Sequence, residues 1–169
     1  ELMPADKKIV VAVAANPNGY STGWQGSYDY AGLADYCDYL MIMAYDESYY
    51  GSEPGAVASY SFVENSIKYA LSVVPKEQIV VGLPFYGRIW SDSGDYPQGY
   101  GISNTDIEEL VNTYDGQVTF DSASQSSRAE ITIESSDDKP VVGTRTLTAG
   151  TYTIWYENEQ SMKSMLTLV

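Results

Sequence analysis

The sequence has no histidine, a single cysteine and few basic residues, and each shortage excludes a kind of site. Without histidine there is no Ser-His-Asp or Cys-His catalytic unit and no His-ligated metal. Because Cys37 is the only cysteine, an intrachain disulfide and a cysteine-cluster metal site are excluded as well. We therefore expect no metal and no cofactor, and a chemistry carried by carboxylates, phenols, hydroxyls and amides.

The charge is strongly acidic, with 9 Lys+Arg against 23 Asp+Glu in 169 residues and a formal net charge of −14. Nucleic acids and anionic membrane surfaces are bound through clustered cations, so this balance argues against both partners. No apolar run reaches the roughly 18 residues of a membrane helix, and we see no signal peptide. The 16 tyrosines and 3 tryptophans suit contact with a sugar or a peptide, although many will fill the core.

The first half of the chain has the pattern of an α/β fold. Residues 8–15, 38–45 and 78–83 are continuous apolar runs, typical of strands that are buried on both faces. Helical patterns over residues 29–36 and 62–74 separate them. The alternating order predicts parallel strands with right-handed crossovers.

The pattern changes after Trp90. Residues 91–101 are rich in Gly, Ser, Tyr and Asp and predict a loop, and Asn104 is expected to cap a short helix that ends near residue 114. Alternating strand patterns follow at 117–121, 129–134 and 152–156, before a last helix over 157–168. We therefore divide the chain into an α/β part (1–91), an inserted α+β subdomain (92–151) and a return strand with the next helix (152–169).

Polar side chains that could hold a ligand follow the three predicted parallel strands. Asn16 follows the first, Tyr45 and Asp46 the second, and Tyr86 and Arg88 the third. Function in α/β folds gathers at the carboxyl ends of the strands, and this set suits a polar, neutral ligand. The alternative is structural: a Tyr-Asp pair can anchor a loop, and an arginine can neutralise an acidic rim.

The aromatic residues and one further acid have two interpretations each. Trp24 could stack on a sugar or cover the rim of the fold. Trp90 could form the floor of a subsite, although we favour a wedge between the two parts of the chain. Glu47 could replace a missing catalytic acid, but a solvated loop carboxylate is the preferred interpretation.

Three segments resemble signatures of family 18 glycoside hydrolases, the chitinases and their relatives. Residues 40–46 (Leu-Met-Ile-Met-Ala-Tyr-Asp) resemble the sixth-strand signature, and residues 82–88 (Gly-Leu-Pro-Phe-Tyr-Gly-Arg) the seventh. Residues 156–158, with Ser161 and Lys163, resemble the segment that enters the helix after the family's α+β insertion. Residues 8–15 then fit the fifth strand. The motifs are most similar to the bacterial branch that trims spore-cortex peptidoglycan.

This resemblance implies a partial (β/α)8 TIM barrel, about strands five to seven, with the inserted subdomain. The family's catalytic signature, Asp-x-x-Asp-x-Asp-x-Glu, is absent: Asp35 and Asp38 are followed by Leu40 and Ile42, where acids are required. The eighth strand is absent too. We therefore expect the catalytic Glu to lie outside this chain and the chain alone to be inactive.

The resemblance also implies retaining, substrate-assisted hydrolysis of β-1,4-linked N-acetylglucosamine polymers, either chitin or peptidoglycan. Tyr45 would orient the acetamide of the sugar, Asp46 would contact the distorted ring, and Tyr86 and Arg88 would line the cleft. A non-catalytic carbohydrate-binding protein, a lectin, is the alternative. We expect the parent protein to act outside the cytoplasm, at a cell wall or spore. We also expect the half-barrel to self-associate through its uncovered edges.

Overall fold

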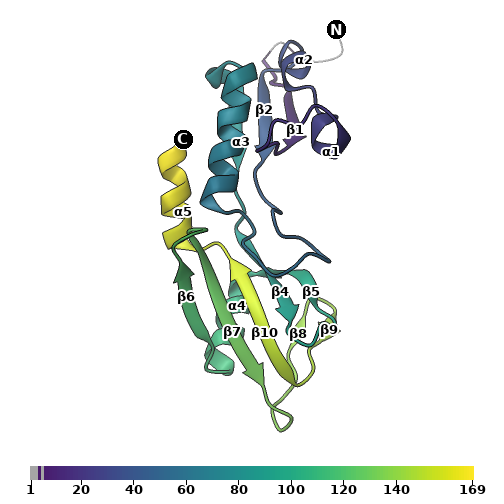
Figure 1. Ribbon diagram of the computed structural model, residues 1–169, viewed down its shortest axis with the longest axis vertical. Coiled ribbons are helices and arrows are strands. Elements are labelled where there is room, and N and C mark those ends of the chain that lie inside the picture. Colours follow the sequence, from purple (N-terminus) through teal and green to yellow (C-terminus); the bar gives the residue numbers. More distant parts are fainter. Residues whose placement is uncertain (1–3, 5) are drawn as a thin grey trace. The chain divides into compact units, whose positions relative to one another are not determined.

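The computed structural model describes residue 4 and residues 6–169, which form two compact units (Figure 1). The first unit contains the chain up to Tyr45 together with Ser61–Leu83 and Leu168–Val169. The second contains Asp46–Tyr60 and Pro84–Thr167. In the described part of the chain, no helix combines the length and the apolarity needed to cross a membrane.

The first unit is a parallel three-stranded sheet in the order β1-β2-β3, which confirms the predicted α/β pattern. Helices α2 and α3 connect these strands, as the sequence predicted. The elements are β1 (Val10–Ala14), α1 (Gly23–Gly26), α2 (Tyr30–Ala34), β2 (Tyr39–Met43), α3 (Tyr60–Val73), η1 (Lys76–Gln78) and β3 (Ile79–Gly82).

The short helix α2 is held by its cap and by one tyrosine. The Asp29 carboxylate accepts a 3.0 Å hydrogen bond from the amide of Gly32, which satisfies one of the free N–H groups of the first turn. The buried Tyr30 donates its hydroxyl to the backbone oxygen of Ala14 at the end of β1. Its ring meets that of Tyr69 on α3 edge to face at 5.2 Å. A single side chain therefore joins both crossovers to the first strand.

The second unit is an antiparallel five-stranded sheet in the order β5-β4-β10-β7-β6, with α4 across one face (Figure 1). A small hairpin, β8–β9, and the helices α5 and η2 complete the chain. The elements are β4 (Tyr86–Ser91), β5 (Gln98–Ser103), α4 (Asn104–Thr113), β6 (Gln117–Asp121), β7 (Ser126–Ile133), β8 (Val141–Val142), β9 (Arg145–Thr146), β10 (Gly150–Tyr156), α5 (Glu159–Met165) and η2 (Leu166–Leu168).

The core of the second unit lies between α4 and its sheet. Ile107 and Leu110 of α4 are buried against Ile89 of β4 and Ile154 of β10. Gly87 lets the helix approach closely, because a Cβ atom there would lie 2.7 Å from Cδ1 of Ile107. Alternate residues of the strands thus face the helix, and the intervening residues are free to build the opposite face.

Two expectations for the second half need correction. The segment predicted as a loop over residues 91–101 ends in a strand, since β5 begins at Gln98, and β4 was not predicted as a strand of this sheet. Ser103, rather than Asn104, caps α4: its hydroxyl accepts from the amide of Asp106 at 3.1 Å. The compact unit also extends beyond 92–151, because it includes β4, β10 and residues 46–60. The division into barrel and insertion stays a prediction.

Candidate functional site

Three of the six predicted site residues form one cluster in the second unit. Tyr86 and Arg88 are two residues apart on β4 and therefore project from the same face of the sheet. The Tyr86 hydroxyl donates to Oδ1 of Asp46 at 2.5 Å, and Nη2 and Nε of Arg88 reach the same oxygen at 2.7 and 3.1 Å. We call these three residues the carboxylate cluster.

The carboxylate cluster is held in place from several sides. The Arg88 side chain is only 14% exposed, and its Nη1 donates to the backbone oxygen of Gly99 at 2.6 Å. Asp46 has a left-handed backbone with φ of 59°, a conformation that aspartate tolerates better than most residues. Its side chain is 41% exposed, and no hydrogen bond to Oδ2 is seen among the described residues. That oxygen can accept a hydrogen bond from a ligand hydroxyl or amide.

The other three predicted site residues lie in the first unit. Tyr45 is half-buried after β2, and its ring packs on Gly82, where a Cβ atom would lie 3.3 Å from Cε1. Trp24 on α1 is 69% exposed and meets Tyr28 edge to face, so its indole is accessible to a ligand.

Asn16 differs from the other predicted site residues because it is fully buried. Its Nδ2 donates to the backbone oxygen of Tyr20, and its Oδ1 accepts from the amide of Tyr20, both at 2.9 Å. Asn16 therefore closes its own loop, and this geometry does not support direct contact with a ligand.

Two alternatives for the neighbouring loop are decided by local contacts. Trp90 is fully buried and donates its indole N–H to the backbone oxygen of Ser52 at 2.9 Å, so it cannot form the floor of an open subsite. Glu47 accepts from the amide of Ser59 at 2.7 Å, while its own amide donates to Val57. Glu47 therefore closes the loop, which gives it a structural role.

Glu157 is a buried carboxyl that the sequence did not single out as a site residue. Its Oε1 accepts from the Ser126 hydroxyl at 2.9 Å, and its buried Oε2 makes no hydrogen bond of ordinary length to the described residues. Burial raises the pKa of Glu157 to about 7; the hydroxyls of Ser161 and Ser126 and the amide of Ala58 lower this pKa, and Glu47 raises it slightly. Because Glu157 is fully buried, we assign it a structural role.

An open groove of about 650 Å³ adjoins the carboxylate cluster within the second unit. Arg88 lies in its wall, and its other side chains are aromatic or basic: Tyr50, Tyr96, Tyr100 and Arg145, besides Thr144. This groove was not predicted from the sequence, because residues 91–101 have the composition of a loop. The only sequence signal was the density of tyrosine around that segment.

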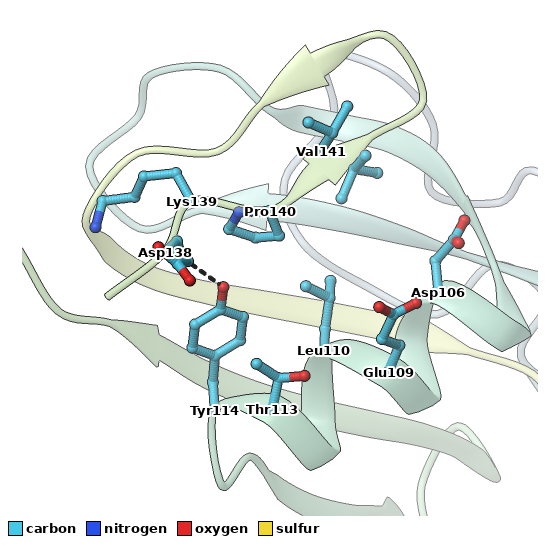
Figure 2. A pocket seen from close by; sticks show the side chains of 10 residues that line it. Asp106, Glu109, Leu110, Thr113, Tyr114, Asp138, Lys139, Pro140 and Val141 are labelled. Atoms are coloured by element: carbon cyan, nitrogen blue, oxygen red, sulfur yellow. Dashed lines mark hydrogen bonds between the residues drawn. The ribbon is translucent and has the colours of Figure 1, made fainter. Parts of the chain in front are cut away.

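A second cavity, of about 230 Å³, is acidic and contains none of the predicted site residues (Figure 2). Asp106 and Glu109 of α4 lie on one side of it, and the Tyr114 hydroxyl donates to the backbone oxygen of Asp138 at 2.7 Å. Lys139 donates to the backbone oxygen of Glu134 at 2.8 Å. Tyr114 and Lys139 thus hold the turn that borders this cavity.

The Asp-Tyr-Arg cluster beside an aromatic groove offers hydrogen-bonding groups next to flat apolar faces, which suits a polar ligand with an apolar face. The sequence profile of glycosyl hydrolases family 18 matches residues 2–169. The chain therefore belongs to this family, which confirms the resemblance found in its motifs.

Individual relatives agree with the family. The putative sporulation-specific glycosylase YdhD of Bacillus subtilis is 28% identical over 164 residues, 95% of this chain but 35% of that protein. Its crystal structure matches with a TM-score of 0.80 at 26% identity, covering 96% of this chain and 51% of that one. A chitinase from Chromobacterium violaceum matches with a TM-score of 0.75 at 29% identity, covering 91% and 44%. The chain thus spans about a third of the length of YdhD.

Proposed function

We propose that this chain is part of a retaining glycoside hydrolase that acts on β-1,4-linked N-acetylglucosamine polymers, chitin or peptidoglycan. The observation that carries the proposal is the carboxylate cluster, which is assembled from residues of two family motifs in a chain that the family profile matches throughout. The names of the related sporulation and chitinase proteins support a wall or spore substrate.

The proposed mechanism uses the substrate's own acetamide, which is an exception to the two-carboxylate scheme. The acetamide oxygen attacks the anomeric carbon while the glycosidic bond breaks, and a general acid gives its proton to the departing oxygen. Water then opens the cyclic intermediate and returns a proton to the same carboxyl group. Because the acidic signature does not occur in these residues, the proposal assigns the general acid to a part of the protein outside this chain.

The residues of this chain would position the sugar. The Tyr45 phenol would hydrogen-bond the acetamide and hold it in line for attack, which supplies part of the rate through orientation. Oδ2 of Asp46 would accept from the distorted sugar, because Oδ1 is already engaged by Tyr86 and Arg88. Tyr86 and Arg88 would therefore hold the Asp46 side chain in place while the sugar changes shape.

We further propose that the three-stranded sheet is strands five to seven of a (β/α)8 barrel, with residues 92–151 as the core of the inserted subdomain.

Both outer strands, β1 and β3, have one unpaired edge in the described part of the chain. Such edges favour self-association when the chain is studied alone. Light scattering is expected to give a mass above 18.6 kDa at tens of micromolar, and a monomeric mass would contradict this expectation.

Hydrolysis of a fluorogenic N-acetylglucosamine oligomer tests the function. The chain alone is expected to be inactive, and the longer gene product that the proposal requires is expected to cleave, with Asp46→Asn lowering its kcat by at least about tenfold. Activity of the chain alone would overturn the assignment of the acid and make Glu47→Gln the next variant. Glycan binding without cleavage by the longer protein would replace the hydrolase with the lectin.

A further inference from the structure

The groove beside the carboxylate cluster contains an unusual share of the chain's positive charge. Two of the three arginines in the sequence, Arg88 and Arg145, line it, although the formal net charge is −14. Its remaining side chains are mainly the rings of Tyr50, Tyr96 and Tyr100. Flat aromatic walls and guanidinium groups together suit a ligand that has both sugar rings and negative charge.

The position of Arg145 is fixed by the hairpin that carries it. Val142 and Leu147 on either side of the β8–β9 turn are buried in the core of the second unit. The turn itself rests on Tyr100: Gly143 has φ of 62°, and a Cβ atom there would lie 2.3 Å from the Tyr100 hydroxyl. The guanidinium carbon of Arg145 then lies 4.5 Å from the centroid of the Tyr96 ring. The hairpin therefore places the guanidinium of Arg145 against the ring of Tyr96.

The two arginines of the groove differ in what they already bind. The Arg88 guanidinium donates hydrogen bonds to Asp46 and to the backbone oxygen of Gly99. Arg145 is exposed, and in the described part of the chain its guanidinium makes neither an ion pair nor a hydrogen bond, only the contact with Tyr96. A guanidinium that stacks on a ring keeps its planar fork of N–H donors for an anion.

We propose that Arg145, stacked on Tyr96, binds a carboxylate carried by a sugar residue, so that the groove selects an acidic amino-sugar polymer over neutral chitin. Within the substrate classes considered above, this is a glycan whose sugars bear a lactyl carboxylate. The inference rests on the proposed function, since it assumes that a glycan reaches the carboxylate cluster. To that function the inference adds a specific role for Arg145, the recognition of the negative charge of the glycan.

Three ligands of equal length test this inference separately from the proposed function. They are a tetrasaccharide of alternating N-acetylglucosamine and N-acetylmuramic acid, the same tetrasaccharide with its carboxyls converted to amides, and the N-acetylglucosamine tetramer. Binding is followed by NMR titration at low ionic strength, because an exposed ion pair is screened by salt. The variants are Arg145→Met and Arg145→Lys, with Arg128→Met as the matched control, since Arg128 pairs with Glu130 and does not line the groove.

The wild-type chain is expected to bind the acid about fivefold more tightly than its amide, the scale of an exposed ion pair. Arg145→Met should abolish the preference for the acid over its amide, Arg145→Lys should keep part of it, and Arg128→Met should keep all of it. Equal affinity for acid and amide would overturn the inference but not the proposed function. If none of the three ligands binds, both are overturned. A lower melting temperature of Arg145→Met with the acid preference intact would reduce Arg145 to a structural role.

Discussion

The two sheets of this chain differ in how far their own residues cover them. In the antiparallel sheet, inward residues such as Ile89, Ile131 and Ile154 are fully buried, and α4 closes one face. In the parallel sheet, Val10 of β1 is 51% exposed and Val80 of β3 is 41% exposed. Parallel strands are normally covered on both faces, so these exposures are unusual for their type.

The difference indicates where stability resides and what the parallel sheet requires. The second unit has a contiguous hydrophobic core and holds all three residues of the carboxylate cluster. The first unit holds Tyr45 and Trp24 on a sheet with exposed apolar strands. We infer that it is stabilised by additional strands of the parent protein or by a second copy of the chain.

The largest effect is expected from a cavity in the second unit. Ile154→Ala removes a fully buried side chain from the core and should cost about 2–5 kcal/mol of stability. Val80→Ala, in the exposed part of β3, should cost less than about 1 kcal/mol. Urea unfolding of each variant, followed by hydrogen exchange of the backbone amides, measures both changes. Equal losses of stability in the two variants, or slower exchange in β1 and β3 than in β7 and β10, would show that the antiparallel sheet is not the more stable of the two.

A pH-dependent effect of similar size is expected from Glu157, which belongs to the second unit alone. Because burial raises its pKa to about 7, the folded chain keeps a proton that the unfolded chain loses near pH 4.5. The stability from this group is complete below about pH 4.5, falls as the pH rises to about 7, and is constant above. The total change is on the order of 3 kcal/mol.

Glu157→Gln should remove this slope, because the amide cannot ionise. The variant should match the wild type near pH 4.5 and exceed its stability at pH 8, as measured by urea midpoints across this range. Glu108→Gln, an exposed acid on α4, is the control and should leave the slope unchanged. A slope that persists in Glu157→Gln would assign the effect to another group.

Substitutions at Asp46 and Tyr45 test whether the carboxylate cluster keeps its structure independently of the first unit. Asp46→Ala removes the carboxylate that binds the partly buried Arg88 and should cost about 1–3 kcal/mol. Asp46→Asn keeps an acceptor oxygen and tolerates the left-handed backbone, so most of this stability should survive while glycan affinity falls. Tyr45→Phe should weaken glycan binding without changing hydrogen exchange in β4. Faster exchange there would contradict independence.

The fold of the first unit was predictable because its signals are local. Continuous apolar runs marked all three strands, and Asp29 marked the start of α2. The second unit was predictable only in part. β4 follows directly on a predicted strand of the other sheet. β5 has one aliphatic residue, Ile102, among Gln, Gly, Tyr and Ser residues, so its strand conformation depends on pairing with β4. Tertiary pairing therefore overrode a composition that is typical of loops.

The candidate site does not follow this division, because its clustered residues lie in the second unit and Asn16 lies in the first. Asp46, Tyr86 and Arg88 were found because motifs carry them at strand ends. Asn16 had the same sequence context, but its burial and its bonds to Tyr20 appear only in three dimensions. Arg145 could not be found, because its place beside Tyr96 depends on a hairpin that only the core of the second unit positions.

The smallest effects come from one helix cap in each unit. Asn158 accepts from the amides of Gln160 and Ser161 at the start of α5, and Asp29 caps α2 in the first unit. Replacing either by alanine should cost about 1 kcal/mol, and replacement by serine should restore most of it. Because α5 contacts β7, Asn158→Ala should speed hydrogen exchange in the antiparallel sheet, whereas Asp29→Ala should act on β1 and β2 alone. If either change spreads through both sheets, the chain unfolds as one cooperative body, and the parallel sheet is more stable than its exposed strands indicate.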